Sequence, residues 1–385
     1  MLTVERVGSL PGDADLAPAW GELLSRCPWR SLFLSYDWTV TWWEHFGAGS
    51  ELWLLLVREG TKIVGIAPMM LTRERYGGLP VRTLGFLRNR HTSRSDFIIP
   101  DRRREVLAAL VRFWREHAGE WDVLRLVGMD EASGTVTLVL EELRRGGLDS
   151  FAPRPHRRLD FLPLAPAGEG DWPQLVGSWS YRFRRSRALA RNRLERAGRA
   201  SFARDCGPAE VAGSMDRLFA LEALSWKSAS ALAAFDERDR RFHRALAARM
   251  APGGGFENLF LVLDGRTIAG LHSLIHDQVR YLMLTYFDPE HRALSPGRQV
   301  MEAAIEISVT EGRLGEVDFN GTSPLLRSWA THSRSLHSLS ACSRRPYSRM
   351  VAGLKRIKRL IEDGELGPPQ SQAPTAGAGA GSSGE

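Results

Sequence analysis

The stretch VRYLMLTYFDPEHRALSPGRQVMEAAIEISVTEG, residues 279–312, decides how this chain folds. Its first nine residues, 279–287, include valine, threonine and aromatic side chains, which are typical of a strand. From Gly297 to about Glu311 the apolar residues recur at helical spacing, and Glu316–Phe319 is again strand-like. This order predicts a strand–helix–strand crossover within an α/β fold.

The start of this helix is a candidate anion site. Ser295 is a suitable N-cap, and Pro296 fits the first helical position, where a missing N–H costs nothing. The amides of Gly297, Arg298 and Gln299 are expected to point out of the helix end, where the helix dipole favours a pyrophosphate. Taken alone, Ser-Pro-Gly-Arg also fits an ordinary junction between a loop and a helix.

The same order of elements occurs twice in the chain. In the second half, Asp264-Gly265 separates two strand-like runs, and in the first half Glu59-Gly60 does the same. Both dipeptides are typical of a tight hairpin turn. Further strands are expected at Leu52–Val57, Lys62–Met70, Val81–Leu87, Asp96–Ile99, Asp122–Val127, Arg158–Leu162, Phe260–Leu263 and Thr267–Ile275, and further helices at Arg103–His117, Thr135–Arg145, Arg182–Ala197, Ser214–Trp226, Arg238–Met250 and Met350–Ile361.

The repeat predicts two domains of similar architecture, each a mixed and mostly antiparallel sheet flanked by helices. The expected limits are residues 1–165 and 166–363, with the boundary in the proline- and glycine-rich stretch Pro163–Pro173. The tail 364–385 contains almost no large apolar side chain and is expected to be disordered.

The composition is that of an ordinary globular protein. The 385 residues are 43% hydrophobic and 25% charged, and no apolar run approaches the ~18 residues that span a membrane. The N-terminus does not resemble a signal peptide. The cysteines Cys27, Cys206 and Cys342 lie far apart without metal-ligand spacing, so we expect reduced thiols, a cytoplasmic protein and no metal.

The net charge of +7 has a local origin. Between Arg182 and Arg204 the chain carries nine arginines and a single acid, Glu195, which accounts for the whole excess. The predicted helix in this segment has a thin apolar stripe. It is either a solvated helix, a clamp for phosphates of a donor or an acidic acceptor, or an RNA-binding face.

Four passages together resemble the CelD/BcsL-type branch of the GNAT acyltransferase superfamily. They are SLPGD…CPWRSLFLSYDWTVTWWEHFG, ELWLLLVREGTKIVGIAPMML, YFDPEHRALSPGRQVMEAAIE and GEVDFNGTSPLLRSWA. That branch has tandem GNAT units and is related to the FemABX peptidyltransferases. Its members commonly carry a Tyr-Lys pair before the last tryptophan, where this chain has Leu325-Leu326-Arg327-Ser328-Trp329, so its handling of the acceptor is expected to differ.

The resemblance implies transfer of an acyl group from a thioester, either acyl-CoA or the phosphopantetheine of an acyl carrier protein, to an amine. The pantetheine arm would lie between two splayed strands of the second domain. The first domain has no glycine at its helix start, Pro100–Arg104, and is expected to lack a donor site. The amine would belong to a small molecule, a sugar or a peptide, and would bind between the domains.

Two alternatives stay open. An aminoacyl-tRNA-dependent peptidyltransferase would use the arginine-rich helix to bind RNA, and a catalytically silent binding protein would explain the missing Tyr-Lys pair.

The candidate site residues come from the strand ends and from the loop of the first half. For each of them, packing or a turn role is the alternative to a functional one. The catalytic candidates are Tyr286, Asp318, Glu222 and His272; the donor-binding candidates are Ser295, Pro296, Gly297, Arg298, Gln299 and Asn320; the acceptor-binding candidates are Asp96, His91, Trp226 and Arg327.

Overall fold

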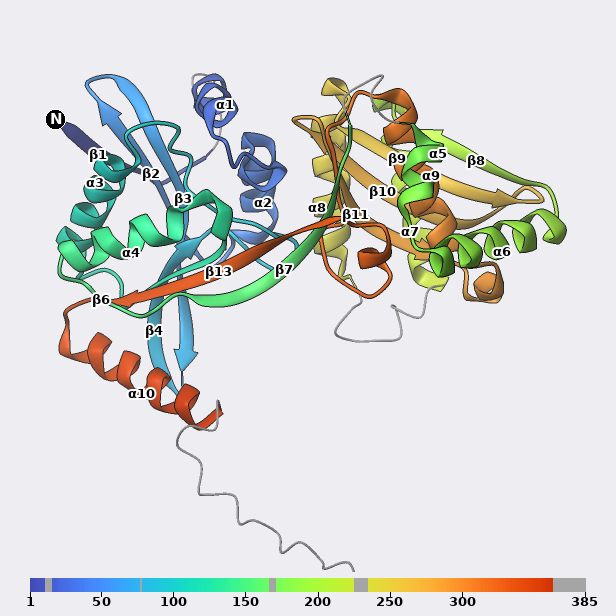
Figure 1. Ribbon diagram of the computed structural model, residues 1–385. Helices are drawn as coiled ribbons and strands as arrows, with labels where there is room; N and C mark the ends of the chain where they lie inside the picture. The colour runs from blue at the N-terminus through green and yellow to red at the C-terminus, as the bar shows by residue number, and fades with distance from the viewer. Residues whose placement is uncertain (11–15, 77, 166–170, 225–234, 363–385) are drawn as a thin grey trace, which may run out of the picture.

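The computed structural model describes the chain except for residues 11–15, 77, 166–170, 225–234 and 363–385. Its strands join in one 13-stranded sheet with the order β1-β2-β3-β4-β5-β13-β7-β12-β11-β10-β9-β8, and β6 pairs with β13. Helices cover both faces of this sheet along its length (Figure 1). The predicted α/β class is confirmed.

The first half of the sheet is built around a long hairpin. β2 and β3 pair across Gly60, and β4 then pairs in parallel with β5 over Thr83–Gly85 and Val123–Arg125, with α3 as the crossover. The elements of this half are β1 (Leu2–Val7), α1 (Leu16–Arg26), α2 (Tyr36–Phe46), β2 (Glu51–Glu59), β3 (Lys62–Tyr76), β4 (Leu79–Phe86), α3 (Arg103–Glu116), β5 (Val123–Asp130) and α4 (Thr135–Arg145).

The second half repeats this arrangement. The hairpin β9–β10 turns at Gly265, β11 follows, and α9 crosses over to β12, which pairs in parallel with β11. The expected repeat of one α/β architecture is therefore observed. The elements are α5 (Trp172–Ser178), α6 (Tyr181–Ala197), β8 (Ala200–Asp205), α7 (Val211–Leu224), α8 (Glu237–Met250), β9 (Phe256–Leu263), β10 (Arg266–His276), β11 (Val279–Phe287), α9 (Pro296–Glu311) and β12 (Glu316–Asp318).

The two halves exchange strands. β7 (Arg154–Pro163), which closes the first half in sequence, pairs with β12 of the second half. β13 (His332–Cys342), which follows the second half, pairs with β5 of the first and also with the short strand β6 (Asp149–Ser150). β7 and β13 also pair with each other and run side by side between the halves (Figure 1). The strand exchange turns two sheets into one continuous sheet.

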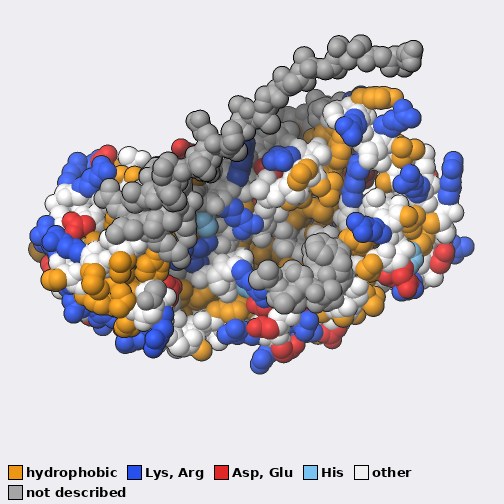
Figure 2. Space-filling model, turned by 90° about the horizontal axis from the view of Figure 1, so that it is seen from below, with side chains coloured by type: hydrophobic (Ala, Val, Ile, Leu, Met, Phe, Trp, Pro, Cys, Tyr) orange, Lys and Arg blue, Asp and Glu red, His pale blue; other side chains and the backbone are white. Residues whose placement is uncertain are grey.

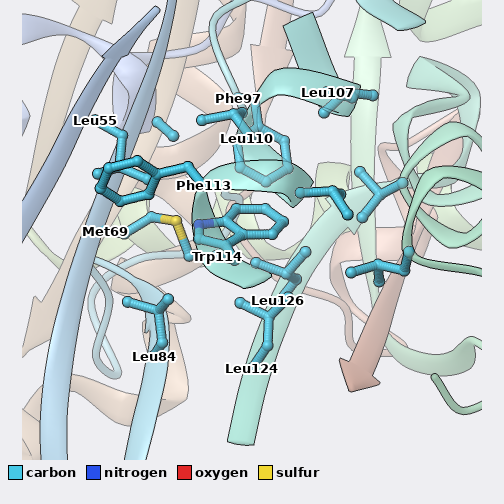
Figure 3. Close-up of a cluster of buried hydrophobic side chains, with 14 of the residues drawn as sticks. Leu55, Met69, Leu84, Phe97, Leu107, Leu110, Phe113, Trp114, Leu124 and Leu126 are labelled. Atoms are coloured by element: carbon cyan, nitrogen blue, oxygen red, sulfur yellow. The ribbon is translucent and has the colours of Figure 1, made fainter. Parts of the chain in front are cut away.

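Two large apolar clusters hold the first half together. One lies between the sheet and the helices α3 and α4, with Phe113 and Trp114 of α3 facing Met69, Leu124 and Leu126 of the strands (Figure 3). The cluster on the opposite face packs α1 and α2 against the sheet and continues into the second half, where it includes Phe242 of α8 and Tyr281 of β11. The halves therefore share a core as well as strands.

Some expected elements differ from those observed. Asp96–Ile99 is not a strand and makes only one isolated bridge, between Ile98 and Ile66. The strands β1, β8 and β13 had no sequence prediction. The predicted helix at Met350–Ile361 is observed as α10 (Pro346–Glu362), whereas the tail 364–385 and part of the predicted domain boundary lie outside the described residues. The domain limits stay a prediction.

Several expected properties concern the whole chain. None of the helices within the described ranges is long and apolar enough to cross a membrane. The same part of the chain holds no group of three or more potential metal-ligating side chains. Cys27, Cys206 and Cys342 are free thiols.

Candidate functional site

The strands β11 and β12 separate soon after they begin. They pair only over Val279–Tyr281 and Glu316–Asp318, and β11 then continues to Phe287, where the described part of the chain provides no strand partner on that side. The chain beyond β12 bonds instead toward β7, through the Phe319 amide and the Asp160 carbonyl at 3.2 Å. Within the described residues no strand therefore pairs with this edge of β11 beyond Tyr281, and the place where β11 and β12 diverge is called the gap below.

A β-bulge lies on β11 beside this gap. Leu282 pairs with Ser273 and Leu284 pairs with His272, so Met283 is the extra residue. Because of the bulge, Leu282 faces the α9 side of the sheet and Leu284 the α7 side, although both have even numbers. Such bulges are common next to active sites because they re-aim side chains and interrupt pairing.

The start of α9 lies against the end of β11. A methyl group added at Gly297 would come within 3.3 Å of Phe287 Cδ1 and 3.6 Å of Thr285 Cγ2, so only glycine fits without a shift. The expected capping by the Ser295 side chain is wrong: Ser295 occupies the N-cap position but is left-handed, with φ 54°, and its side chain caps nothing.

The amides at this helix start are also less available than expected. The N–H groups of Arg298 and Gln299 both donate to the Ser295 carbonyl, at 3.0 and 3.1 Å. Pro296 has no N–H. Within the described residues this leaves the Gly297 amide as the one of the three predicted donors that has no backbone acceptor.

The side chain of Arg298 is held by α6. Its guanidinium donates to Ser186 Oγ at 2.9 Å and lies 4.6 Å from the centre of the Phe183 ring, while burial lowers its pKa. On the same helix, Arg187 pairs with Glu302 of α9. These contacts fix the arginine-rich helix beside the α9 start. Gln299 is largely buried, and its side-chain Nε2 has no hydrogen-bond partner in the part of the chain that the structure describes.

The α7–α8 side of the sheet carries a group of polar side chains near the end of β11. Tyr286 is buried, and burial together with the nearby Glu222 carboxylate raises its pKa, so its hydroxyl stays protonated. Glu222 of α7 accepts from Arg240 Nε of α8 at 2.9 Å and from the Phe235 amide at 3.2 Å.

His91 and His272 belong to a buried histidine cluster between the halves. His91 Nε2 lies 2.7 Å from Asp239 Oδ1, and its ring centre is 5.2 Å from that of His243, which in turn is 5.9 Å from His272. His272 Nδ1 contacts Asn258 Oδ1 at 2.8 Å. Burial lowers the pKa of all three histidines, that of His272 to about 3, so they are neutral near pH 7.

Asp318 and Asn320 lie where the two halves meet. Asp318 is 1% exposed and pairs with Arg94 of the first half at 2.9 Å and with Arg334 of β13 at 3.6 Å. Asn320 contacts Ser93 Oγ through its side chain, while its backbone N–H donates to Asp318 Oδ1 at 2.7 Å. These contacts tie the loop of the first half to the end of β12.

The remaining candidates are scattered. Asp96 is buried in the first half, where burial raises its pKa to about 7 although it accepts from the Phe97 amide and from Thr135 Oγ1. Arg327 lies in a short 3₁₀ helix after β12, Leu326–Ser328. Trp226 lies outside the described residues. The structure thus brings Tyr286, Glu222 and His91 to one region and leaves Asp96 and Arg327 elsewhere.

In the first half the corresponding gap is filled by the chain itself. Beyond the end of β4, Ile98 pairs with Ile66 of β3 and the Ser95 amide donates to the Gly128 carbonyl of β5. Arg102, at the start of α3, has the same left-handed conformation as Ser295, which supports the repeat. The space between β4 and β5 is therefore occupied by residues 95–98.

Sequence reasoning missed several charged residues of the site. Asp239 and Arg240 lie in the first turns of a helix that was predicted, but its sequence ERDRRFHRALAARM is charged throughout and marks neither of them. Arg94 lies in the polar loop FLRNRHTSRSDF, where several arginines look equivalent. Only the tertiary contacts single these residues out.

Comparison with known proteins bears on this architecture. Residues 182–324 match the family described as acetyltransferase (GNAT) domain. The structure titled "Crystal structure of FemX" superposes with a TM-score of 0.61 at 13% identity, covering 87% of this chain and 98% of that one. A conserved protein of unknown function from Bacteroides thetaiotaomicron superposes with a TM-score of 0.51 at 13% identity, covering 89% and 100%. No curated protein sequence matches the chain.

Residues 182–324 are therefore similar to a GNAT acetyltransferase domain, and the predicted class of enzyme, an acyltransferase, is confirmed. The likeness to FemX supports the fold of the whole chain. Assignment to the CelD/BcsL branch stays a prediction.

Proposed function

We propose that this chain is a cytoplasmic N-acyltransferase that takes an acyl group from a thioester bound at the gap between β11 and β12. The acceptor would be an amine on a small molecule, a sugar or a peptide, bound on the α7–α8 side of the sheet. The observation that carries the proposal is the separation of β11 from β12 after Tyr281 and Asp318, with the start of α9 beside the open edge.

The gap suits a thioester donor. An extended pantetheine arm can lie along the edge of β11 with which, within the described residues, no strand pairs beyond Tyr281, and a phosphate can approach the Gly297 amide because residue 297 has no side chain. Acyl-CoA and an acyl carrier protein present the same arm. The donor itself supplies the activated carbonyl.

The reaction needs a donor for the developing oxyanion and a proton for the leaving sulfur. The amine nitrogen bonds to the carbonyl carbon and loses one proton to water, the C–S bond breaks, and the thiolate takes up a proton. A backbone N–H on the open edge of β11 would stabilise the oxyanion. Tyr286, whose raised pKa keeps its hydroxyl protonated, would donate a hydrogen bond to the departing thiolate, and the thiolate would take its proton from water.

The other catalytic candidates are assigned different roles in this proposal. Glu222 would orient Arg240 beside Tyr286, since it accepts two hydrogen bonds at a buried position. His272 and Asp318 would maintain the framework, because their partners are buried side chains of the protein.

The test is a substitution at Gly297. Gly297→Val places methyl groups against Phe287, so we expect the KM for the donor to rise at least tenfold, or donor binding in calorimetry to disappear. The matched control is Gly315→Ala at the far end of the α9 crossover, where an added methyl group meets nothing within 4 Å. Failure of the unmodified chain to bind either acyl-CoA or an acylated carrier protein would refute the proposal.

A second donor, aminoacyl-tRNA, is favoured by one observation. Arg182, Arg185 and Arg193 on α6 are exposed, and α6 is bonded to the start of α9 through Arg298. Figure 2 shows lysine and arginine side chains gathered over the end of the molecule where α6 lies in Figure 1. A cationic face beside the donor gap suits a phosphate backbone.

The salt dependence of RNA binding distinguishes this donor. Replacing Arg182, Arg185 and Arg193 with alanine should make the negative slope of log K against log salt shallower by about 2 to 3. The control replaces Arg115, Arg144 and Arg313, which are exposed elsewhere and should leave the slope unchanged. Binding with equal slopes in both variants would exclude this role of α6.

A further inference from the structure

A cavity of about 410 Å³ lies away from the donor gap, beside the first half of the sheet. The segment that follows α1 forms one wall, with Trp29 and Ser31, and the loop residues Arg94 and Ser95 form another. The remaining wall includes Arg103 at the start of α3 and the turn before α4. A volume of this size is typical of small-molecule sites.

Four buried polar atoms belong to residues that line this cavity and have no hydrogen-bond partner among the described residues; one of them, Arg334 Nη1, still lies 3.6 Å from Asp318 Oδ2. The other three are Ser31 Oγ, Ser95 Oγ and Arg94 Nε, on residues that are 1%, 5% and 9% exposed. Buried polar groups are almost always satisfied, because leaving one unpaired costs about 1–3 kcal/mol. Four such atoms around one cavity therefore point to a ligand or to ordered water.

The carboxylates and the arginines that line the cavity differ in how many hydrogen-bond partners the protein provides for them. The Asp96 carboxylate accepts from the Phe97 amide and from Thr135 Oγ1, and the Asp130 carboxylate accepts from the Ala132 amide at 3.0 Å and lies 3.6 Å from Arg334. Both carboxylates thus already have donors from the protein.

The arginines retain free donors. Arg103 donates to Thr135 Oγ1 at 2.6 Å and lies 3.9 Å from the centre of the Trp29 ring, but it forms no ion pair within the described ranges. The Nε–H of Arg94 is a donor only and cannot be satisfied by another donor. What the cavity lacks is therefore hydrogen-bond acceptors.

We propose that this cavity binds a small molecule through an oxyanion group, either a carboxylate or a phosphate monoester. Arg94 Nε and the two serine hydroxyls would donate to the oxygens, and Arg103 would supply a second positive charge. The starts of α3 and α4, which flank the cavity, favour an anion through their helix dipoles.

The ligand would be connected to the donor gap through Arg94. The same guanidinium donates through Nη2 to Asp318 of β12 at 2.9 Å and to the Tyr281 hydroxyl of β11 at 3.3 Å. An anion bound to Nε would therefore be linked, through one guanidinium group, to both strands that form the gap. This site does not depend on which donor the enzyme uses.

The test uses calorimetry with inorganic phosphate and with acetate, each titrated into the full chain at constant ionic strength. We expect at least one of the two to bind, and their relative affinity distinguishes a phosphate site from a carboxylate site. Ala132→Trp, which fills the exposed mouth of the cavity without removing any buried contact, should abolish binding.

Two further variants separate the site from general electrostatics. Arg103→Gln should weaken binding at least tenfold, whereas Arg104→Gln, one residue further along α3 and paired with Glu141 outside the cavity, should not. No binding of either anion to the unmodified chain, or equal weakening by the two glutamine variants, would overturn the proposal. If Ala132→Trp still binds the acyl donor, the loss of anion binding at the cavity is independent of the donor gap.

Discussion

The ion pair between Arg94 and Asp318 should stabilise the junction of the two halves. Asp318→Asn keeps the shape of the side chain but leaves the Arg94 guanidinium buried without its carboxylate. Removing one partner of a buried pair typically costs about 3–5 kcal/mol. Because Arg94 keeps its bond to the Tyr281 hydroxyl, we expect the lower end of that range, about 3 kcal/mol.

The assay is urea denaturation followed by tryptophan fluorescence and far-UV circular dichroism, whose transitions should coincide for a single cooperative unit. The double variant Arg94→Met/Asp318→Asn should recover part of the loss, because it removes the unpaired charge. An Asp318→Asn protein as stable as the unmodified chain, but inactive, would refute this reasoning and return Asp318 to a catalytic role.

Two other outcomes follow from the same structure. The native state holds His91, His243 and His272 at lowered pKa values, so below pH 6.5 the unfolded state binds more protons than the native state, and the free energy of unfolding falls by up to about 1.4 kcal/mol per histidine and pH unit. The melting temperatures at pH 7.5 and 5.5 should therefore differ less for His243→Phe than for the exposed control His332→Gln. Equal differences in the two variants would contradict this assignment. A chain ending at Ala330 lacks β13 and exposes the edges of β5 and β7, so we expect size-exclusion chromatography to show that it aggregates. The control chain, which ends at Glu362, should remain monodisperse. A monodisperse chain ending at Ala330 would show that β13 is dispensable.

The parts of the fold that the sequence predicted depend on local signals. The hairpins at Gly60 and Gly265 have turn residues with positive φ, and Thr135–Arg145 is a helix with clear 3.6-residue periodicity. Both properties are carried by residues close together in the chain. The pairing of β13 with β5 joins residues about 200 positions apart, and its sequence HSRSLHSLSAC is too polar to mark a central strand.

The candidate site was predictable to a smaller extent for the same reason. The glycine at the start of α9 follows from the strand–loop–helix order, but the orientation of Arg298 is set by Ser186 and Phe183 on a distant helix. The position of His91 beside Asp239 and His243 likewise requires both halves to be folded together. The unexpected turn at Ser295 shows that a suitable capping residue does not guarantee a cap when the backbone is left-handed.

The exchanged strands also constrain how the protein is made. During synthesis the open edge of β5 has no strand to pair with until β13 emerges about 200 residues later, which at about 5–20 residues per second is on the order of 10–40 s. Throughout that time a nearly complete first half exposes a strand edge with which other nascent chains can pair. We therefore expect the newly made polypeptide to depend on chaperones, and slow translation to favour its aggregation.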